Sequence, residues 1–182
     1  MKLKYATVLT VAGSLISGAA NADALIDVYA GATIGVGAAT VFENKHNSTD
    51  TAHSYGAVLG MDVPLVRIEL EYDYLNNKEY DMQLGMINLY GKLPTTVVHP
   101  YLGVGVGTAF DGAVNITPDA TVKTNSGTAY QAMIGLTFDL PVLPFKVDTE
   151  GRAIYVPNFY TIADTNPDLL QYELRVKLRY IF

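Results

Sequence analysis

The chain has 182 residues, no cysteine and a formal net charge of −6 at pH 7. This composition excludes a disulfide scaffold and a thiolate metal site, and it lacks the basic footprint of a nucleic-acid-binding protein. Beyond the first residues, no apolar run approaches the ~20 residues that a membrane-spanning helix needs. A mature chain that crosses a membrane must therefore do so as a closed β-barrel, because only closure satisfies the backbone of strands in lipid.

The first 22 residues have the three-part layout of a secretory signal peptide. A basic start at residues 1–4 precedes an apolar stretch at 5–16, and small residues follow as far as Ala22. The apolar stretch is too short for a membrane anchor. We expect cleavage after Ala22, which leaves one mature domain of residues 23–182. Its formal charge is −8, because two lysines leave with the signal.

Eight stretches of alternating apolar and polar residues follow in the mature chain. Successive side chains of a strand point to opposite faces, so each stretch predicts a strand with one apolar and one polar face. The stretches are Leu25–Thr40, His53–Val63, Val66–Tyr74, Asp81–Leu93, Tyr101–Phe110, Tyr130–Asp139, Lys146–Tyr155 and Leu169–Phe182.

The third and the last stretches show the alternation most clearly. In the third, four ionisable residues from Arg67 to Asp73 alternate with Val66, Ile68, Leu70, Tyr72 and Tyr74. In the last, charged residues alternate with an apolar series that runs from Leu170 to Phe182. The fourth stretch is the weakest, since Leu84 and Met86 share one phase and Ile87 and Leu89 the other. A β-bulge near Gly85–Ile87 is our expectation there.

The connections between the stretches alternate in length. Those after the second, fourth and sixth stretches are short and contain proline. The others are longer and polar, at Val41–Ala52, Asn76–Tyr80, Asp111–Ser126 and Pro157–Asp168. Long loops on one side and short turns on the other are typical of outer-membrane barrels. We predict an all-β, eight-stranded antiparallel up-and-down transmembrane barrel, with both termini on the periplasmic side.

The charged faces would then point into the barrel. Buried charges are tolerated when they are paired and hydrogen-bonded, so we expect a lumen charge network. It comprises Arg67, Glu69, Glu71, Asp73, Lys146, Asp148, Glu150, Arg152, Glu173, Arg175, Lys177 and Arg179. A soluble lipocalin-like barrel would invert the two faces. Aromatic residues on the apolar faces near the strand ends favour the membrane, where they would form an interfacial girdle.

The chain resembles the small eight-stranded outer-membrane barrels of Gram-negative bacteria, of the OmpA, OmpX and opacity-protein type. The residues that carry the resemblance are Pro100–Gly107, Ala129–Leu136 and the closing Leu178–Phe182. The resemblance implies that Leu178, Tyr180 and Phe182 form the C-terminal signal read by the barrel-assembly machinery. It also leads us to expect a barrel without a following peptidoglycan-binding domain.

The motifs that could indicate a catalytic or binding site have simpler structural explanations. The glycines of Gly103–Gly107 are not followed by a helix pattern, so they are better explained as room for long side chains of neighbouring strands than as a phosphate loop. His46, Asp50 and His53 lie at the first long connection, without the fixed spacing of a metal site. Some barrels of this class resemble serine hydrolases that act on lipid A, but His53 and Ser54 are adjacent and so face opposite ways. We predict no catalytic, metal or cofactor site.

The predicted function is a structural or surface-interaction role, adhesin-like, in the cell outer membrane. The expected partners are outer-membrane lipid and lipopolysaccharide, the barrel-assembly machinery, and a host or cell-surface ligand at the loops; no nucleic acid is expected. The alternative is a narrow porin-like pore through the charged lumen, although an eight-stranded barrel has room only for its own side chains. A lipid-modifying enzyme is a remote alternative.

Overall fold

The structure is a computed structural model that describes residues 26–43, 46–77, 80–95, 97–117, 120–123, 127–140, 142–158 and 168–182. The predicted signal peptide lies outside these residues. The described chain forms nine strands and no helix that could cross a membrane. They are β1 (Asp27–Glu43), β2 (His46–Asp62), β3 (Val66–Asn76), β4 (Tyr80–Lys92), β5 (Val98–Thr117), β6 (Ala120–Lys123), β7 (Gly127–Asp139), β8 (Phe145–Val156) and β9 (Asp168–Ile181).

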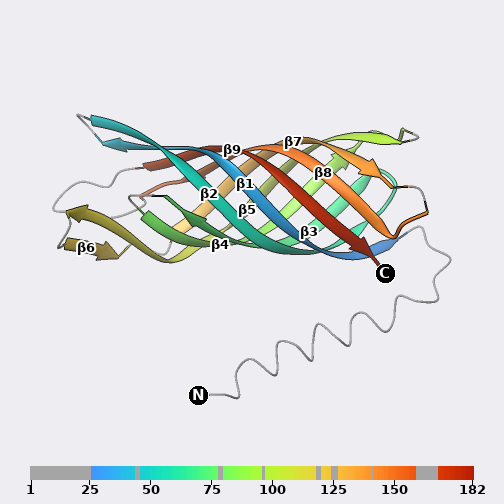
Figure 1. The fold of residues 1–182 in the computed structure, drawn as a ribbon, viewed down its shortest axis with the longest axis horizontal. Coiled ribbons are helices and arrows are strands. Elements are labelled where there is room, and N and C mark those ends of the chain that lie inside the picture. Colours follow the sequence, from blue (N-terminus) through green and yellow to red (C-terminus); the bar gives the residue numbers. More distant parts are fainter. Residues whose placement is uncertain are drawn as a thin grey trace, which may run out of the picture.

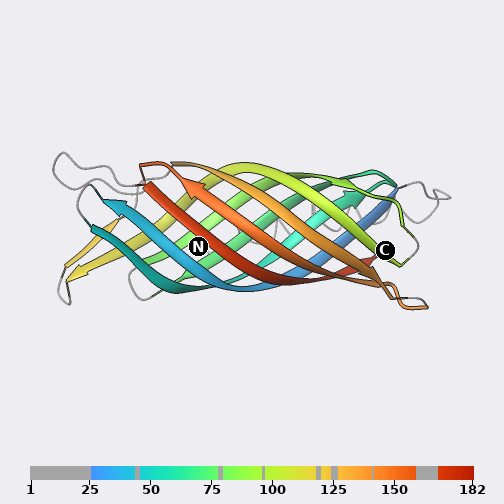
Figure 2. The ribbon, with the colours of Figure 1, turned by 90° about the horizontal axis from the view of Figure 1, so that it is seen from above.

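Eight of these strands close into one antiparallel barrel (Figures 1 and 2). Each pairs with its neighbours in chain order, β1 pairs with β9, and the pairing of β4 with β5 completes the ring. The remaining strand, β6, pairs with β5 at one end of the barrel. The backbone N–H of Phe182 also donates to Val28 O at 3.0 Å, so the chain end is tied to β1. The predicted all-β, eight-stranded up-and-down barrel is confirmed.

The two ends of the barrel differ. One end, which we call the turn end, carries the short connections at residues 63–65, 93–97 and 140–144 and the C-terminal Phe182 (Figure 1, right). The opposite end, which we call the loop end, carries the β1–β2 hairpin and the β5–β6 hairpin (Figure 1, left). The loop end also carries the connection 77–79, which is no longer than the 63–65 turn, so the predicted alternation in length is not followed there.

Two of the predicted loops are partly strand. Within Val41–Ala52, β1 continues to Glu43 and β2 starts at His46, with Glu43 paired to His46. Within Asp111–Ser126, β5 continues to Thr117 and pairs with β6. Polar sequence did not stop the strands there, because the backbone pairing of each hairpin continues beyond the alternating apolar stretch.

The bulge predicted near Gly85–Ile87 is wrong. The register of β4 with β3 runs unbroken from Gly91 to Asp81, and the only shift against β5 in the described pairing lies between Asp81 and Gln83. Leu84 and Met86 face inward while Ile87 and Leu89 face outward, so both phases of this strand are apolar. The reason is that the interior next to Leu84 is itself apolar.

Candidate functional site

The interior of the barrel is filled because long side chains lie opposite small ones. Most of the charged inward positions come from β3, β8 and β9, whereas β1, β2 and β5 contribute many glycines. A Cβ on Gly35 would lie 2.5 Å from the Ser54 hydroxyl and 2.9 Å from a Glu173 carboxylate oxygen. A Cβ on Gly105 would collide with the Asn88 and Gln131 side chains. The inward glycines therefore leave space for the long side chains of neighbouring strands. This is the role predicted from the sequence for the glycines of Gly103–Gly107.

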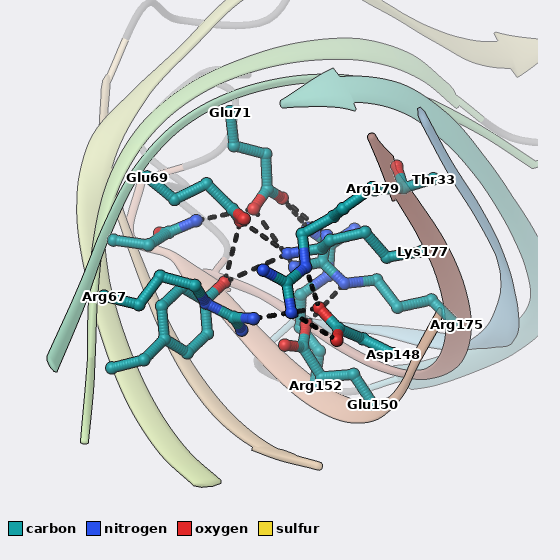
Figure 3. A network of polar contacts seen from close by, with 12 residues as sticks. Thr33, Arg67, Glu69, Glu71, Asp148, Glu150, Arg152, Arg175, Lys177 and Arg179 are labelled. Atoms are coloured by element: carbon teal, nitrogen blue, oxygen red, sulfur yellow. Dashed lines mark hydrogen bonds and ion pairs between the residues drawn. The ribbon is translucent and has the colours of Figure 1, made fainter. Parts of the chain in front are cut away.

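The middle of the lumen holds two arginines among carboxylates (Figure 3). Arg175 lies 2.6 Å from Glu71 and 2.5 Å from Glu150. Arg152 lies 2.5 Å from both Glu71 and Glu173 and also pairs with Asp73. All of these side chains, Glu150 included, have an exposed fraction of 0 %. Each charge is compensated at several points, which is what a buried ionic cluster requires.

A second charged layer follows towards the turn end. Lys177 Nζ lies 2.5 Å from Glu69, while the Arg67 and Arg179 guanidinium groups both lie 2.9 Å from Asp148 (Figure 3). These residues are fully buried. The residues of the predicted charge network therefore lie together inside the barrel. Lys146 differs from the others, because it is only partly buried and lies at the turn-end opening.

Tyrosines complete this second layer. The Tyr29 and Tyr90 hydroxyls donate to Glu69 at 2.6 and 3.0 Å. The Arg67 guanidinium carbon lies 4.0 Å from the Tyr90 ring centre and 4.6 Å from that of Tyr101. A guanidinium between two aromatic faces gains cation–π attraction that is strengthened by desolvation. The network predicted from the sequence contains charged residues only and gives no tyrosine a role.

The loop-end part of the interior is apolar. A continuous cluster of buried side chains from all eight barrel strands fills it. Its members are Ala39, Ala52, Leu75, Met82, Leu84, Met86, Ala109, Ala129, Ile154, Val156 and Leu169. Sequence reasoning missed this layer. The signal was present in Leu75, Ile154 and Leu169, which continue the inward phase of their strands after the charges end.

A small polar cavity opens at the turn end. It has a volume of about 280 Å³ and is bordered by Asp62, Lys92, His99, Asp139 and Lys146, among others. Lys92 pairs with Asp62, and His99 Nε2 lies 3.1 Å from Asp139. Lys146 Nζ lies 3.2 Å from an Asp27 carboxylate oxygen. Sequence reasoning did not include Lys92 in the network, because the phase of β4 was ambiguous.

The outer wall of the barrel is apolar. Leu174, Ile34 and Leu102 have exposed fractions of 72 %, 67 % and 64 %, and similar residues occupy the outward positions of every barrel strand. Aromatic side chains group near both ends. Tyr55 packs against Tyr74 near the loop end, and Tyr180 packs against Phe145 and Phe182 at the turn end. A charged interior inside an apolar wall is the arrangement of a membrane barrel, the inverse of a soluble one.

The sequence candidates for metal binding and catalysis are not assembled by the described residues. The side chains of His46 and Asp50 lie outside the described part of the structure, and no group of three metal-ligating side chains occurs within that part. His53 is exposed, whereas the Ser54 hydroxyl is buried and donates to Glu173 at 3.1 Å. The two side chains therefore point to opposite faces of β2.

Comparisons with known proteins agree on the architecture. No family model and no curated protein matches the chain. Among solved structures, Neisserial surface protein A is similar with a TM-score of 0.61 at 14 % identity, over 87 % of this chain and 98 % of that one. The outer membrane enzyme PagL (TM-score 0.52) and the N-terminal barrel domain of Pseudomonas aeruginosa OprF (0.50) are also similar, each at 14 % identity over 81 % of this chain and 97 % of theirs.

The chain has the fold of the small outer-membrane β-barrels. The resemblance noted in the sequence is confirmed at this level, and the outer-membrane location predicted for the chain agrees with its apolar wall. A surface protein and an enzyme share the fold, so the fold alone does not decide between binding and catalysis.

Proposed function

We propose that this protein is an integral outer-membrane barrel that acts as a rigid, sealed scaffold and binds partners at the cell surface through its loop end. The observation that carries the proposal is the filled interior. Two fully buried ion-paired layers and an apolar layer follow one another across the barrel. Water and ions would have to displace paired charges in the first two and enter an unfavourable apolar zone in the third. We therefore favour a sealed barrel over the alternative of a porin-like pore.

The loop end offers backbone groups for an interaction. Strand β2 pairs with β3 only from His53 to Asp62, so among the described strands its segment His46–Ala52 pairs with β1 alone. Strand β6 pairs with β5 alone. Such edges can take up an extended segment of another protein by adding a strand. Because these hairpins are held by a stiff barrel, an incoming segment would meet preformed strands.

The proposal assigns the other predicted partners to other surfaces. The apolar wall would contact membrane lipid, including lipopolysaccharide in the outer leaflet, and the strand end with Leu178, Tyr180 and Phe182 would be read by the assembly machinery. We propose no catalytic role. Of the histidines whose side chains are described, His53 points outward and His99 pairs with Asp139 at the opposite end.

Replacing either of the two hairpin tips tests the proposed role in binding at the cell surface. Residues 41–52 or 111–126 would be replaced by a short turn, and vesicles holding each refolded variant would be applied to cultured host cells. We expect adhesion above that of empty vesicles for the parent and a loss for at least one variant. A heat-dependent gel shift of each variant would show that the barrel still folds. Equal adhesion of the parent and both folded variants would contradict the proposal.

A further inference from the structure

The three short turns carry exposed apolar side chains beyond the ends of the strands. Val142 is fully exposed, and Leu65, Leu93, Val97 and Leu143 have exposed fractions between 53 % and 62 %. We call these five residues the apolar rim. In a barrel whose turns stand in water, such a group is costly, because apolar surface exposed to water is unfavourable. Grouped exposed apolar residues mark a contact surface.

The charges of the turn end point away from this rim. None of the described residues in the turns, 63–65, 93–95, 97, 140 and 142–144, is ionisable. The nearby lysines instead turn into the cavity, where Lys92 pairs with Asp62 and Lys146 with Asp27. The end of the barrel therefore has a charged centre and an uncharged apolar circumference.

Val142 is held in a conformation that its side chain disfavours. Its φ angle is +79°, and Leu143 N donates to Leu140 O at 3.1 Å, which closes a tight turn around it. A glycine or asparagine usually occupies a turn position with positive φ. A β-branched residue is disfavoured there, because its Cβ comes too close to the following carbonyl oxygen. Because Val142 is fully exposed, packing against the described residues of this chain does not explain a valine at this position.

The apolar rim is continuous with the lipid-facing wall. Leu65 and Leu93 border an apolar groove of about 750 Å³ whose other side is formed by Leu102, Ile134 and Leu136 of the wall. The groove exists because Gly91 lies between them, and a Cβ there would meet nothing within 4 Å. On the other side of the barrel, the Phe145, Tyr180 and Phe182 cluster follows the 140–144 turn.

We propose that the apolar rim is a lipid-binding surface, embedded in the headgroup boundary of the membrane leaflet at the turn end. The groove over Gly91 takes up part of a phospholipid acyl chain. Continuity with the wall identifies lipid as the occupant, since the same molecules that cover the wall reach the rim without a gap. The inference rests on the membrane insertion that the proposed function requires.

The absence of tryptophan from the chain makes the test direct. Single variants Val142→Trp, Leu143→Trp and Leu65→Trp would be refolded into phosphatidylcholine vesicles, with and without bromine on the acyl chains near the headgroup. Leu70→Trp, in the wall, and Asn76→Trp, at the loop end of β3, are the controls. Tryptophan emission reports polarity, and bromine quenches it only on contact.

We expect the three rim variants to emit at shorter wavelength than Asn76→Trp and to lose most of their emission in brominated vesicles. Rim tryptophans that emit like Asn76→Trp and are not quenched would overturn the inference. Because the vesicles hold no other protein, such a result would assign the rim to a protein partner. Quenching of Leu70→Trp in a second set of vesicles, with bromine deep in the acyl chains, would show that the barrel is inserted, so failure of the inference and failure of membrane insertion give different results.

Discussion

Arg175 shows how single residues hold the lumen closed. Its guanidinium group contacts Glu71, Glu150 and Asp73, at 2.6, 2.5 and 3.3 Å. The identities of such residues could be predicted from alternation, but their partners could not. Glu71 and Arg175 are 104 positions apart, and which side chains meet across the lumen depends on how the closed strands are staggered, which no local pattern encodes.

Removing Arg175 is expected to destabilise the barrel strongly. Arg175→Met leaves Glu71 and Glu150 facing each other with less compensation, and breaking a buried ion pair costs about 3–5 kcal/mol. Urea unfolding of the refolded protein in vesicles measures the free energy of unfolding. The triple variant that adds Glu71→Gln and Glu150→Gln should regain most of the loss. A single variant as stable as the parent would show that the lumen is hydrated.

Substitutions at two glycines, one facing inward and one facing outward, are expected to have different effects on stability. At Gly105 a larger side chain meets Asn88 and Gln131, so Gly105→Val is expected to cost about 1–3 kcal/mol through overpacking. At Gly91 a Cβ meets open space, so Gly91→Ala is expected to change stability by no more than about 0.5 kcal/mol. The same urea experiment compares them. Equal effects of the two changes would contradict the assignment of inward and outward faces.

At the scale of strands, the sequence predicts which face of a strand points inward only where one face is charged and the other is apolar. Strands β3 and β9 could be predicted because charges face the lumen and apolar residues face outward. Strand β4 could not, because Leu84 and Met86 face an apolar interior while Ile87 and Leu89 face the apolar exterior. The strand extensions at the hairpin tips were missed because the apolar alternation of the sequence ends before them.

We propose that the C-terminal residues Tyr180 and Phe182 act in the assembly of the barrel into the outer membrane. The double variant Tyr180→Ala, Phe182→Ala removes the exposed aromatic pair but leaves the strand register untouched. We expect much less heat-shifted barrel in the outer membrane of expressing cells, with refolding of the purified chain in detergent little changed. Leu174→Ala, a change at an outward and even more exposed position in mid-strand, is the control. Equal losses in cells and in detergent would mean that the pair acts on stability instead.

At the scale of the whole molecule, the barrel combines an apolar wall, a layered closed interior and unequal ends. The closed interior explains why the chain needs no cysteine to stay rigid: the strands are fixed by pairing around the ring and by ionic contacts across it. In the role that we propose, the loop end binds partners while the barrel below it serves as the rigid support. The apolar rim sets the depth at which this scaffold sits in the membrane.

The central claim, a sealed scaffold rather than a pore, is tested most directly by the conductance of the folded protein in a planar bilayer. The mature chain would be refolded, shown to be folded by its heat-dependent gel shift, and compared with a known porin at the same protein concentration. We predict no steady discrete conductance at neutral pH, because the charged and apolar layers leave no continuous water path. Steady discrete openings that change with Glu69→Ala or Arg175→Ala would contradict the account and identify the charged lumen as the pathway.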